Sequence, residues 1–144
     1  NIDAITSTLQ IDNKDIEVVI DTGSGQCIIT QKYLETLGRG IDQESYSQLI
    51  DINGKETRPL GIVKDVLVTL NGKKPIQMDM VVMRATNYNV ILGNNWLEKI
   101  EATINFKDKI LQCKDGENTI GHPIIFEKEV KKIMLEGDDL YDEE

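Results

Sequence analysis

Aromatic side chains and basic clusters are both scarce in this sequence. Aromatic residues make up 5% of the 144 positions, so branched aliphatic residues must supply most of the core, which favours strands. The net charge is −9, and the basic residues form no patch beyond short pairs such as Lys73-Lys74. Phosphate binding needs concentrated lysine and arginine, and a membrane span needs about 18 consecutive apolar residues. We therefore expect neither nucleic acid nor a membrane as a partner.

Histidine and cysteine are almost absent as well. The single histidine, His122, leaves no Ser-His or Cys-His catalytic pair unless that one residue serves, and Gly121-His122-Pro123 is typical of a turn. Cys27 and Cys113 do not form a metal-binding set, so we predict no metal and no cofactor. Free thiols fit a reducing cytoplasm, although a structural disulfide remains an alternative.

The length indicates one main domain followed by a short tail. We expect the domain to span residues 1–125 and a partly helical, acidic tail to span residues 126–144. A helical stripe begins at Phe126, and residues 137–144 are acidic enough that we expect disorder there. The tail helix could pack on its own domain or contribute to a dimer interface. Because the first residue is Asn1 rather than Met, we expect a fragment or a processed product.

One short stretch combines an apolar run with an isolated carboxylate. Val18-Val19-Ile20 ends in Asp21-Thr22-Gly23-Ser24. An Asp at an apolar margin must be hydrogen-bonded, paired or protonated, and the neighbouring hydroxyl groups can orient its oxygens. The alternative is an ordinary strand followed by an Asx-type turn, which Asp-x-Gly-Ser often forms.

Alternating apolar residues predict a chain built mainly from strands. The predicted strands cover residues 5–11, 16–20, 27–29, 60–70, 76–82, 102–106 and 110–113. Thr30 is a suitable N-cap for a helix from Gln31 to Leu37, with Gly38 as its stop signal. Asn53-Gly54 and Asn71-Gly72 predict two hairpin turns.

The pattern of buried strand, glycine loop and short helix occurs twice. It appears at residues 18–37 and again at residues 90–100, where Val90-Ile91-Leu92-Gly93 precedes a helix beginning near Asn94. Only the first copy carries the aspartate.

These features together resemble the retropepsin-like aspartic proteases. The resemblance rests on Asp21-Thr22-Gly23-Ser24 after three apolar residues, and on Val90-Ile91-Leu92-Gly93 about seventy residues later. The continuation through residues 94–97 and 102–106 looks most like proteases from polyproteins of plant pararetroviruses and long-terminal-repeat retrotransposons. The resemblance covers roughly residues 5–113. It implies an all-β fold, a closed β-barrel with one or two short helices.

The resemblance also implies an aspartic endopeptidase that is active as a homodimer on a polypeptide substrate. Two carboxylates a few ångströms apart share one proton and activate a water, but this chain has one Asp-Thr-Gly motif. Either the protein is inactive, or two chains each contribute Asp21 across a two-fold axis. The substrate would be a viral or retroelement polyprotein in the cytoplasm of the host cell, with this domain part of that polyprotein or released from it.

The resemblance assigns roles to the neighbouring residues. Thr22 would hydrogen-bond across the two-fold axis, Gly23 would let the loops approach, and Ser24 would support the carboxylate. A hairpin near residues 50–62 would be the flap over the substrate, with Gly61 as a second tight backbone position. Flap and pocket candidates are Ile52, Asn53, Gly54, Val90 and Ile91.

Two alternatives remain at the level of sequence. The domain could be a catalytically silent module that dimerises or binds peptides, or a structural β-domain of a virion protein. An intact Asp21 favours catalysis, because an unpaired carboxylate at a desolvated seam costs stability. The acidic composition predicts a pH optimum below 7.

Overall fold

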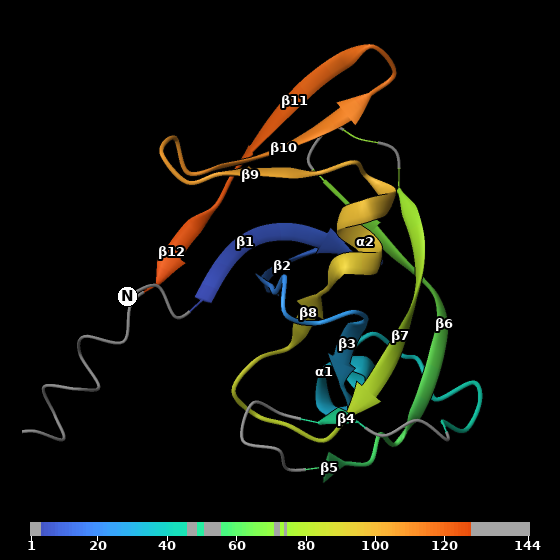
Figure 1. Ribbon diagram of the computed structural model, residues 1–144. Coiled ribbons are helices and arrows are strands. Elements are labelled where there is room, and N and C mark those ends of the chain that lie inside the picture. The colour runs from blue at the N-terminus through green and yellow to red at the C-terminus, as the bar shows by residue number, and fades with distance from the viewer. Residues whose placement is uncertain (1–3, 46–48, 51–55, 71–72, 74, 128–144) are drawn as a thin grey trace, which may run out of the picture.

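The structure is a computed structural model that describes residues 4–45, 49–50, 56–70, 73 and 75–127 (Figure 1). It is built almost entirely from strands, with two six-residue helices. The strands are β1 (Ala4–Ile11), β2 (Lys14–Ile20), β3 (Cys27–Thr30), β4 (Leu49–Ile50), β5 (Glu56–Thr57), β6 (Gly61–Thr69), β7 (Ile76–Met83), β8 (Val90–Leu92), β9 (Thr103–Asn105), β10 (Ile110–Asp115), β11 (Asn118–Pro123) and β12 (Ile125–Glu127). The helices are α1 (Gln31–Thr36) and α2 (Asn94–Lys99).

Six of these strands close into a barrel. Their order is β1-β2-β8-β3-β7-β6, and β6 pairs back onto β1 through Gln10↔Thr69 and Ile11↔Val68. β12 adds to the other half of β1, outside the ring. The prediction of a closed β-barrel with one or two short helices is confirmed, and the helices number two in the described residues.

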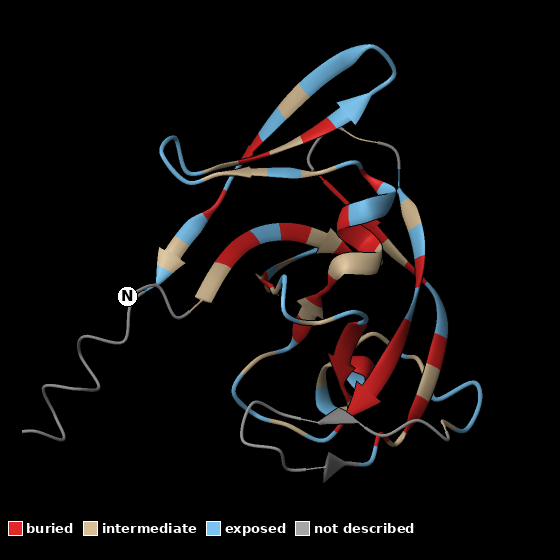
Figure 2. Cartoon of the chain, viewed as in Figure 1, coloured by how far each residue is buried: buried red, intermediate tan, exposed pale blue. Residues whose placement is uncertain are grey.

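The barrel interior is filled by the alternating apolar residues of its strands. Inward positions on β1, β2, β6 and β7 are buried while many of their neighbours are exposed, which Figure 2 shows as alternating colours. Trp96 on α2 is 1% exposed and is the largest fully buried side chain. The innermost members of this core are Ile11, Val18, Ile29, Val63, Val66, Met80, Val82, Val90, Leu92 and Leu111.

The two copies of the strand-and-glycine pattern lie side by side. β2 runs parallel to β8, with Val19 opposite Ile91 and Ile20 opposite Leu92. β3 pairs antiparallel with the other edge of β8. The loop between β2 and β3 and the glycine after β8 are therefore brought to the same end of the barrel.

The helices begin and end where the sequence indicates. Thr30 caps α1, with its hydroxyl oxygen accepting from the backbone N–H of Tyr33 at 3.3 Å. Gly38 has a φ of +73°, the left-handed conformation that commonly follows a helix. α2 starts at Asn94 directly after Gly93, as predicted.

The predicted flap corresponds to a hairpin whose strands are β4 and β5. Leu49 pairs with Thr57 and Ile50 with Glu56, so the connection is the segment 51–55. The flap candidates Ile52, Asn53 and Gly54 fall in that segment, outside the described residues, as does the Asn71-Gly72 turn. Gly61 is a tight backbone position: a Cβ there would lie 2.8 Å from the Gln43 carbonyl oxygen.

The predicted turn at Gly121-His122-Pro123 is wrong. These residues belong to β11, which pairs with β10 in a hairpin that projects from the barrel at the end opposite β4 and β5 (Figure 1). His122 is buried, and its Nε2 lies 3.1 Å from the Thr8 carbonyl oxygen. The polar composition of β11 gives no strand pattern in the sequence. The strand forms because its backbone pairs with that of β10.

The prediction of a helix beginning at Phe126 is wrong for its first two residues. Ile125–Glu127 form β12, with Phe126 opposite Ile5 and Ile125 opposite Thr6 of β1. This segment pairs with the free edge of β1. The tertiary pairing therefore outweighs the local helical periodicity of the sequence. The rest of the predicted tail lies outside the described residues.

Candidate active site

Asp21 lies at the point where β2 leaves the barrel. Its backbone N–H donates to the Leu92 carbonyl oxygen at 3.0 Å, which extends the pairing of β2 with β8 by one bond. Its side chain is partly exposed, and Oδ1 accepts from the backbone N–H of Gly23 at 2.8 Å. The backbone N–H of Ser24 donates to the Asp21 carbonyl oxygen at 3.1 Å. The carboxylate is thus held within a tight loop with one side open.

Thr22 and Gly23 form the exposed tip of this loop. Both are exposed, so none of the residues that the structure describes covers them. A Cβ on Gly23 would lie 3.1 Å from the Asp21 Oδ1 atom, tighter than an ordinary van der Waals contact. A glycine at this position lets its N–H reach the carboxylate without crowding it.

The role that the resemblance implies for Ser24 differs from its contact in the structure. Its hydroxyl donates to the Gln26 carbonyl oxygen at 2.7 Å, within the same loop. In the single chain, the Asp21 carboxylate is held by the Gly23 backbone instead.

The second glycine loop holds the first one in place. The Ser24 carbonyl oxygen accepts from the backbone N–H of Asn94 at 2.7 Å, and the Gly25 carbonyl oxygen accepts from that of Asn95 at 3.3 Å. A Cβ on Gly93 would lie 2.6 Å from the Ser24 carbonyl oxygen and 2.4 Å from that of Gln26. Only glycine permits this approach.

Asn94 and Asn95 are functional candidates that sequence reasoning missed. The Asn94 side-chain amide donates to the Thr22 carbonyl oxygen at 2.8 Å. Asn95 Oδ1 accepts from the thiol of Cys27 at 3.3 Å and from the backbone N–H of Trp96 at 2.9 Å. Two amides directly after Gly93 were the available signal, because amide side chains can both donate and accept.

Cys27 lies at the base of the loop as a buried free thiol. Burial raises the pKa of the Cys27 thiol, while backbone groups of Gly93 and Trp96 and the charge of Lys99 offset part of that rise. The thiol therefore stays protonated and serves as a hydrogen-bond donor. Cys113 is also a buried free thiol, and burial raises its pKa.

The two pocket candidates on β8 face opposite ways. Val90 is fully buried in the main core, so its side chain does not line a groove. Ile91 is partly exposed and packs in a second apolar cluster with Ile28, Val81, Met83 and Tyr88. This second cluster is separate from the main core. It lies on β7, β8 and β3, the strand that directly follows the Asp21 loop, with Tyr88 in the connection before β8.

In the part of the chain that the structure describes, no three His, Cys, Asp or Glu side chains gather in a way that could hold a metal ion. In the described part of residues 4–127, neither helix is long enough and apolar enough to cross a bilayer.

A family model described as "gag-polyprotein putative aspartyl protease" matches residues 7–99. This range includes the Asp21 loop, the β4–β5 hairpin and the whole of α2. Among curated proteins, none matches the chain.

Several solved structures share the fold. The retroviral protease-like domain of Ddi1 from Leishmania major has a TM-score of 0.67 and 17% identity, covering 90% of this chain and 100% of that one. The EIAV protease complexed with the inhibitor HBY-793 has a TM-score of 0.57 and 19% identity, covering 70% and 91%. A retropepsin-like aspartic protease from Rickettsia conorii has a TM-score of 0.57 and 19% identity, covering 84% and 83%.

Proposed function

This chain belongs to the gag-polyprotein aspartyl protease family, and from that premise we propose that it is an aspartic endopeptidase formed by two copies of the chain. Each copy contributes one Asp21. The observation that carries the proposal is the Asp21 carboxylate itself, which is held by the Gly23 N–H in a loop whose tip is open.

The need for two chains follows from the count of motifs. The reaction uses a pair of carboxylates, and this sequence has one Asp-Thr-Gly. A two-fold axis places identical residues opposite each other, so two exposed loop tips can meet there. The exposed Thr22 and Gly23 supply that contact, and the bond from Asn94 to the Thr22 carbonyl keeps the tip in position.

The chemistry is general acid–base catalysis by the shared pair. One carboxylate takes a proton from a water while the other, protonated, donates a hydrogen bond to the scissile carbonyl. The activated water attacks the carbonyl carbon, and the proton passes to the leaving amine. Because the two groups titrate as a pair, a pH–rate profile reports the dyad rather than either residue.

The substrate is a polypeptide bound in an extended conformation between the Asp21 loop and the β4–β5 hairpin. An extended peptide can use backbone hydrogen bonds for affinity and side-chain pockets for selectivity. The second apolar cluster, with Ile91 and Ile28, supplies an apolar wall that begins on β3, the strand directly after the loop. We expect preference for apolar residues beside the cleaved bond.

A viral or retroelement polyprotein, as in plant pararetroviruses or long-terminal-repeat retrotransposons, is the proposed substrate. The description of the matching family supports the polyprotein class. Two buried free thiols are consistent with the cytoplasm of a host cell as the site of action.

Cleavage of the parent polyprotein by wild-type protein and by Asp21→Asn tests this function. Asp15→Asn is the matched control, since Asp15 is an exposed aspartate at the far end of β2. We expect Asp21→Asn to abolish cleavage and Asp15→Asn to retain it, with all three proteins forming dimers in sedimentation. Wild-type activity should fall from pH 5 to pH 9.

Two outcomes would contradict the proposal. If the Asp21→Asn protein still cleaves the polyprotein, the Asp21 carboxylate is not needed for catalysis. A wild-type dimer that binds peptides but cuts none, at any pH between 4 and 8, would favour the silent binding module.

A further inference from the structure

The strand that follows the β4–β5 hairpin in the chain, β6, contains a β-bulge. Its register against β7 shifts between Val63 and Val66, so that two residues of β6, Lys64 and Asp65, lie opposite one residue of β7. Asp65 has a φ of +58°. A bulge bends its strand and leaves backbone groups without partners in the ladder. These groups therefore need hydrogen bonds from elsewhere in the chain.

Side chains supply a partner for each of the four backbone polar groups of the bulge. The Arg39 guanidinium donates to the Lys64 carbonyl oxygen at 2.9 Å and to that of Asp65 at 3.0 Å. The backbone N–H of Lys64 donates to Asp42 Oδ2 at 2.7 Å. The backbone N–H of Asp65 donates to Asp79 Oδ1 at 3.1 Å. Arg39 thus binds both residues of the bulge.

The same guanidinium is held by the turn between β1 and β2. Its Nε lies 2.6 Å from Asp12 Oδ2, and its Nη2 donates to Asp12 Oδ1 at 3.3 Å. Asp12 is itself bonded to β6, because its backbone N–H donates to the Leu67 carbonyl oxygen and its Oδ1 accepts from the Leu67 N–H. The planar fork of an arginine can serve these acceptors together, whereas a lysine ammonium is a single point charge.

The segment that begins at Arg39 runs along β6 and leads toward β4. Gln43 and Ile62 exchange two backbone hydrogen bonds, at 3.2 and 2.8 Å. Gln43 precedes β4 and Ile62 follows β5, so this pairing joins the two ends of the hairpin. The bonds of Arg39 to the bulge lie two residues further along β6. Arg39 therefore ties the base of the hairpin to the barrel.

We propose that Arg39 is a positioning residue for substrate binding, because it fixes the base of the β4–β5 hairpin relative to the barrel. This role rests on the proposed function, in which an extended peptide binds between the Asp21 loop and this hairpin. Arg39 acts through the bulge and the Gln43–Ile62 pairing. A misplaced hairpin weakens contacts that the peptide makes in the ground state and the transition state alike, so its main effect is on KM.

The test compares Arg39→Met and Arg39→Lys with the wild type on a peptide that spans a site cleaved in the parent polyprotein. Arg39→Met keeps an aliphatic stem and loses every donor. We expect it to raise KM by about tenfold, the effect of a small misplacement, with kcat within about twofold of the wild type. Arg39→Lys keeps the charge and loses the fork, so its KM should also stay raised.

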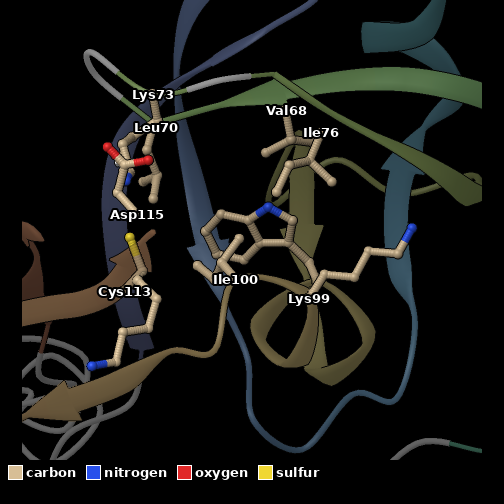
Figure 3. A pocket seen from close by; sticks show the side chains of 10 residues that line it. Val68, Leu70, Lys73, Ile76, Lys99, Ile100, Cys113 and Asp115 are labelled. Carbon is tan, nitrogen blue, oxygen red and sulfur yellow. Dashed lines mark ion pairs between the residues drawn. The ribbon is translucent and has the colours of Figure 1, made fainter. Parts of the chain in front are cut away.

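Lys73→Met is the matched control. Lys73 Nζ lies 3.2 Å from Asp115 Oδ2, and Figure 3 shows both side chains at one side of a pocket that Trp96 also lines. Lys73 follows the end of β6, whereas the hairpin precedes the start of that strand. This variant also loses an ion pair, but distant sites act independently. Its KM should therefore equal that of the wild type.

Amide hydrogen exchange measures the same effect without cleavage. In Arg39→Met, the backbone N–H groups of Gln43 and Ile62 should exchange at least about tenfold faster than in the wild type, since their segment opens locally. The Asp21 N–H, which is bonded to Leu92, should keep its wild-type rate. Lys73→Met should leave the exchange of Gln43 and Ile62 unchanged. This pattern separates an effect at the hairpin base from a general loss of stability.

The two measurements distinguish this role of Arg39 from the proposed function. If the wild type cleaves no site in the polyprotein, the proposed function fails, and the role in substrate binding fails with it. If the wild type cleaves and Arg39→Met retains the wild-type KM, only the role of Arg39 is overturned. Unchanged exchange at Gln43 and Ile62 in Arg39→Met would overturn it too. Wild-type KM in Arg39→Lys would show that a positive charge is sufficient and that the fork is not required.

Discussion

The Asn94 side-chain amide lies 2.8 Å from the carbonyl oxygen of Thr22, the residue that follows Asp21. Together with the bond from the Asn94 backbone N–H to Ser24, it attaches α2 to the Asp21 loop at two points. The loop that carries the proposed catalytic group is therefore positioned by a residue 72 positions away in the sequence.

Asn94→Ala should reduce cleavage much more than it reduces stability. The lost bond is exposed, so we expect a cost of about 0.5–1.5 kcal/mol in the free energy of unfolding. A displaced loop misaligns the dyad, and small misplacements cost roughly tenfold to a hundredfold in rate. Urea unfolding and kcat measured on the same preparations check both numbers.

Asn105→Ala is the control for that variant. Asn105 also uses its side-chain amide in exposed bonds, but to Asp108 in the turn after β9: it donates to the Asp108 carboxylate at 3.2 Å and accepts from the Asp108 backbone N–H at 2.9 Å. It should lose a similar amount of stability and no activity. If both variants keep wild-type kcat, Asn94 does not position the loop.

Gly93→Ala should destabilise the whole fold. The added Cβ would meet backbone carbonyl oxygens of Ser24 and Gln26 at 2.6 and 2.4 Å, and backbone cannot move aside as a flexible side chain can. Overpacking of this kind costs about 1–3 kcal/mol. The measurement is the midpoint of urea unfolding.

Gly25→Ala offers a control within the same loop, because a Cβ there has no atom within 4 Å. We expect its free energy of unfolding to stay within about 0.5 kcal/mol of the wild type. Equal destabilisation by the two alanines would show that the close approach at Gly93 is not what the loop requires.

Stability should decline at alkaline pH because of Cys27. Burial raises the pKa of this thiol in the folded protein, whereas the unfolded thiol ionises near its usual value of about 8.5. Above that pH the unfolded state binds fewer protons than the folded state, so the free energy of unfolding falls as pH rises. The loss attributable to Cys27 is at most about 2 kcal/mol by pH 10.

The comparison is made with Cys27→Ala and with Ile29→Val at pH 7 and pH 10. Both substitutions remove packing at neutral pH, since both side chains are fully buried. Only Cys27→Ala should show a smaller decline between the two pH values. Burial also raises the pKa of Tyr33 and Tyr88, but those groups contribute equally to all three proteins. A decline of equal size in all three would mean that Cys27 does not contribute.

The sequence by itself determined the elements whose signals are local. Alternating apolar residues located β1, β6 and β7, Thr30 and Gly38 marked the ends of α1, and Asp21-Thr22-Gly23 identified the candidate catalytic loop. These features depend on side-chain periodicity, capping and turn chemistry, which act over a few residues.

Only the tertiary structure decided the relationships between distant segments. β11 and β12 lack a clear strand pattern, and they form because β10 and the free edge of β1 offer backbone partners. In the same way, the bond from Asn94 to Thr22 depends on where the start of α2 meets the Asp21 loop. Backbone pairing and burial arise between surfaces, so residues far apart in the chain acquire these roles only when the barrel closes.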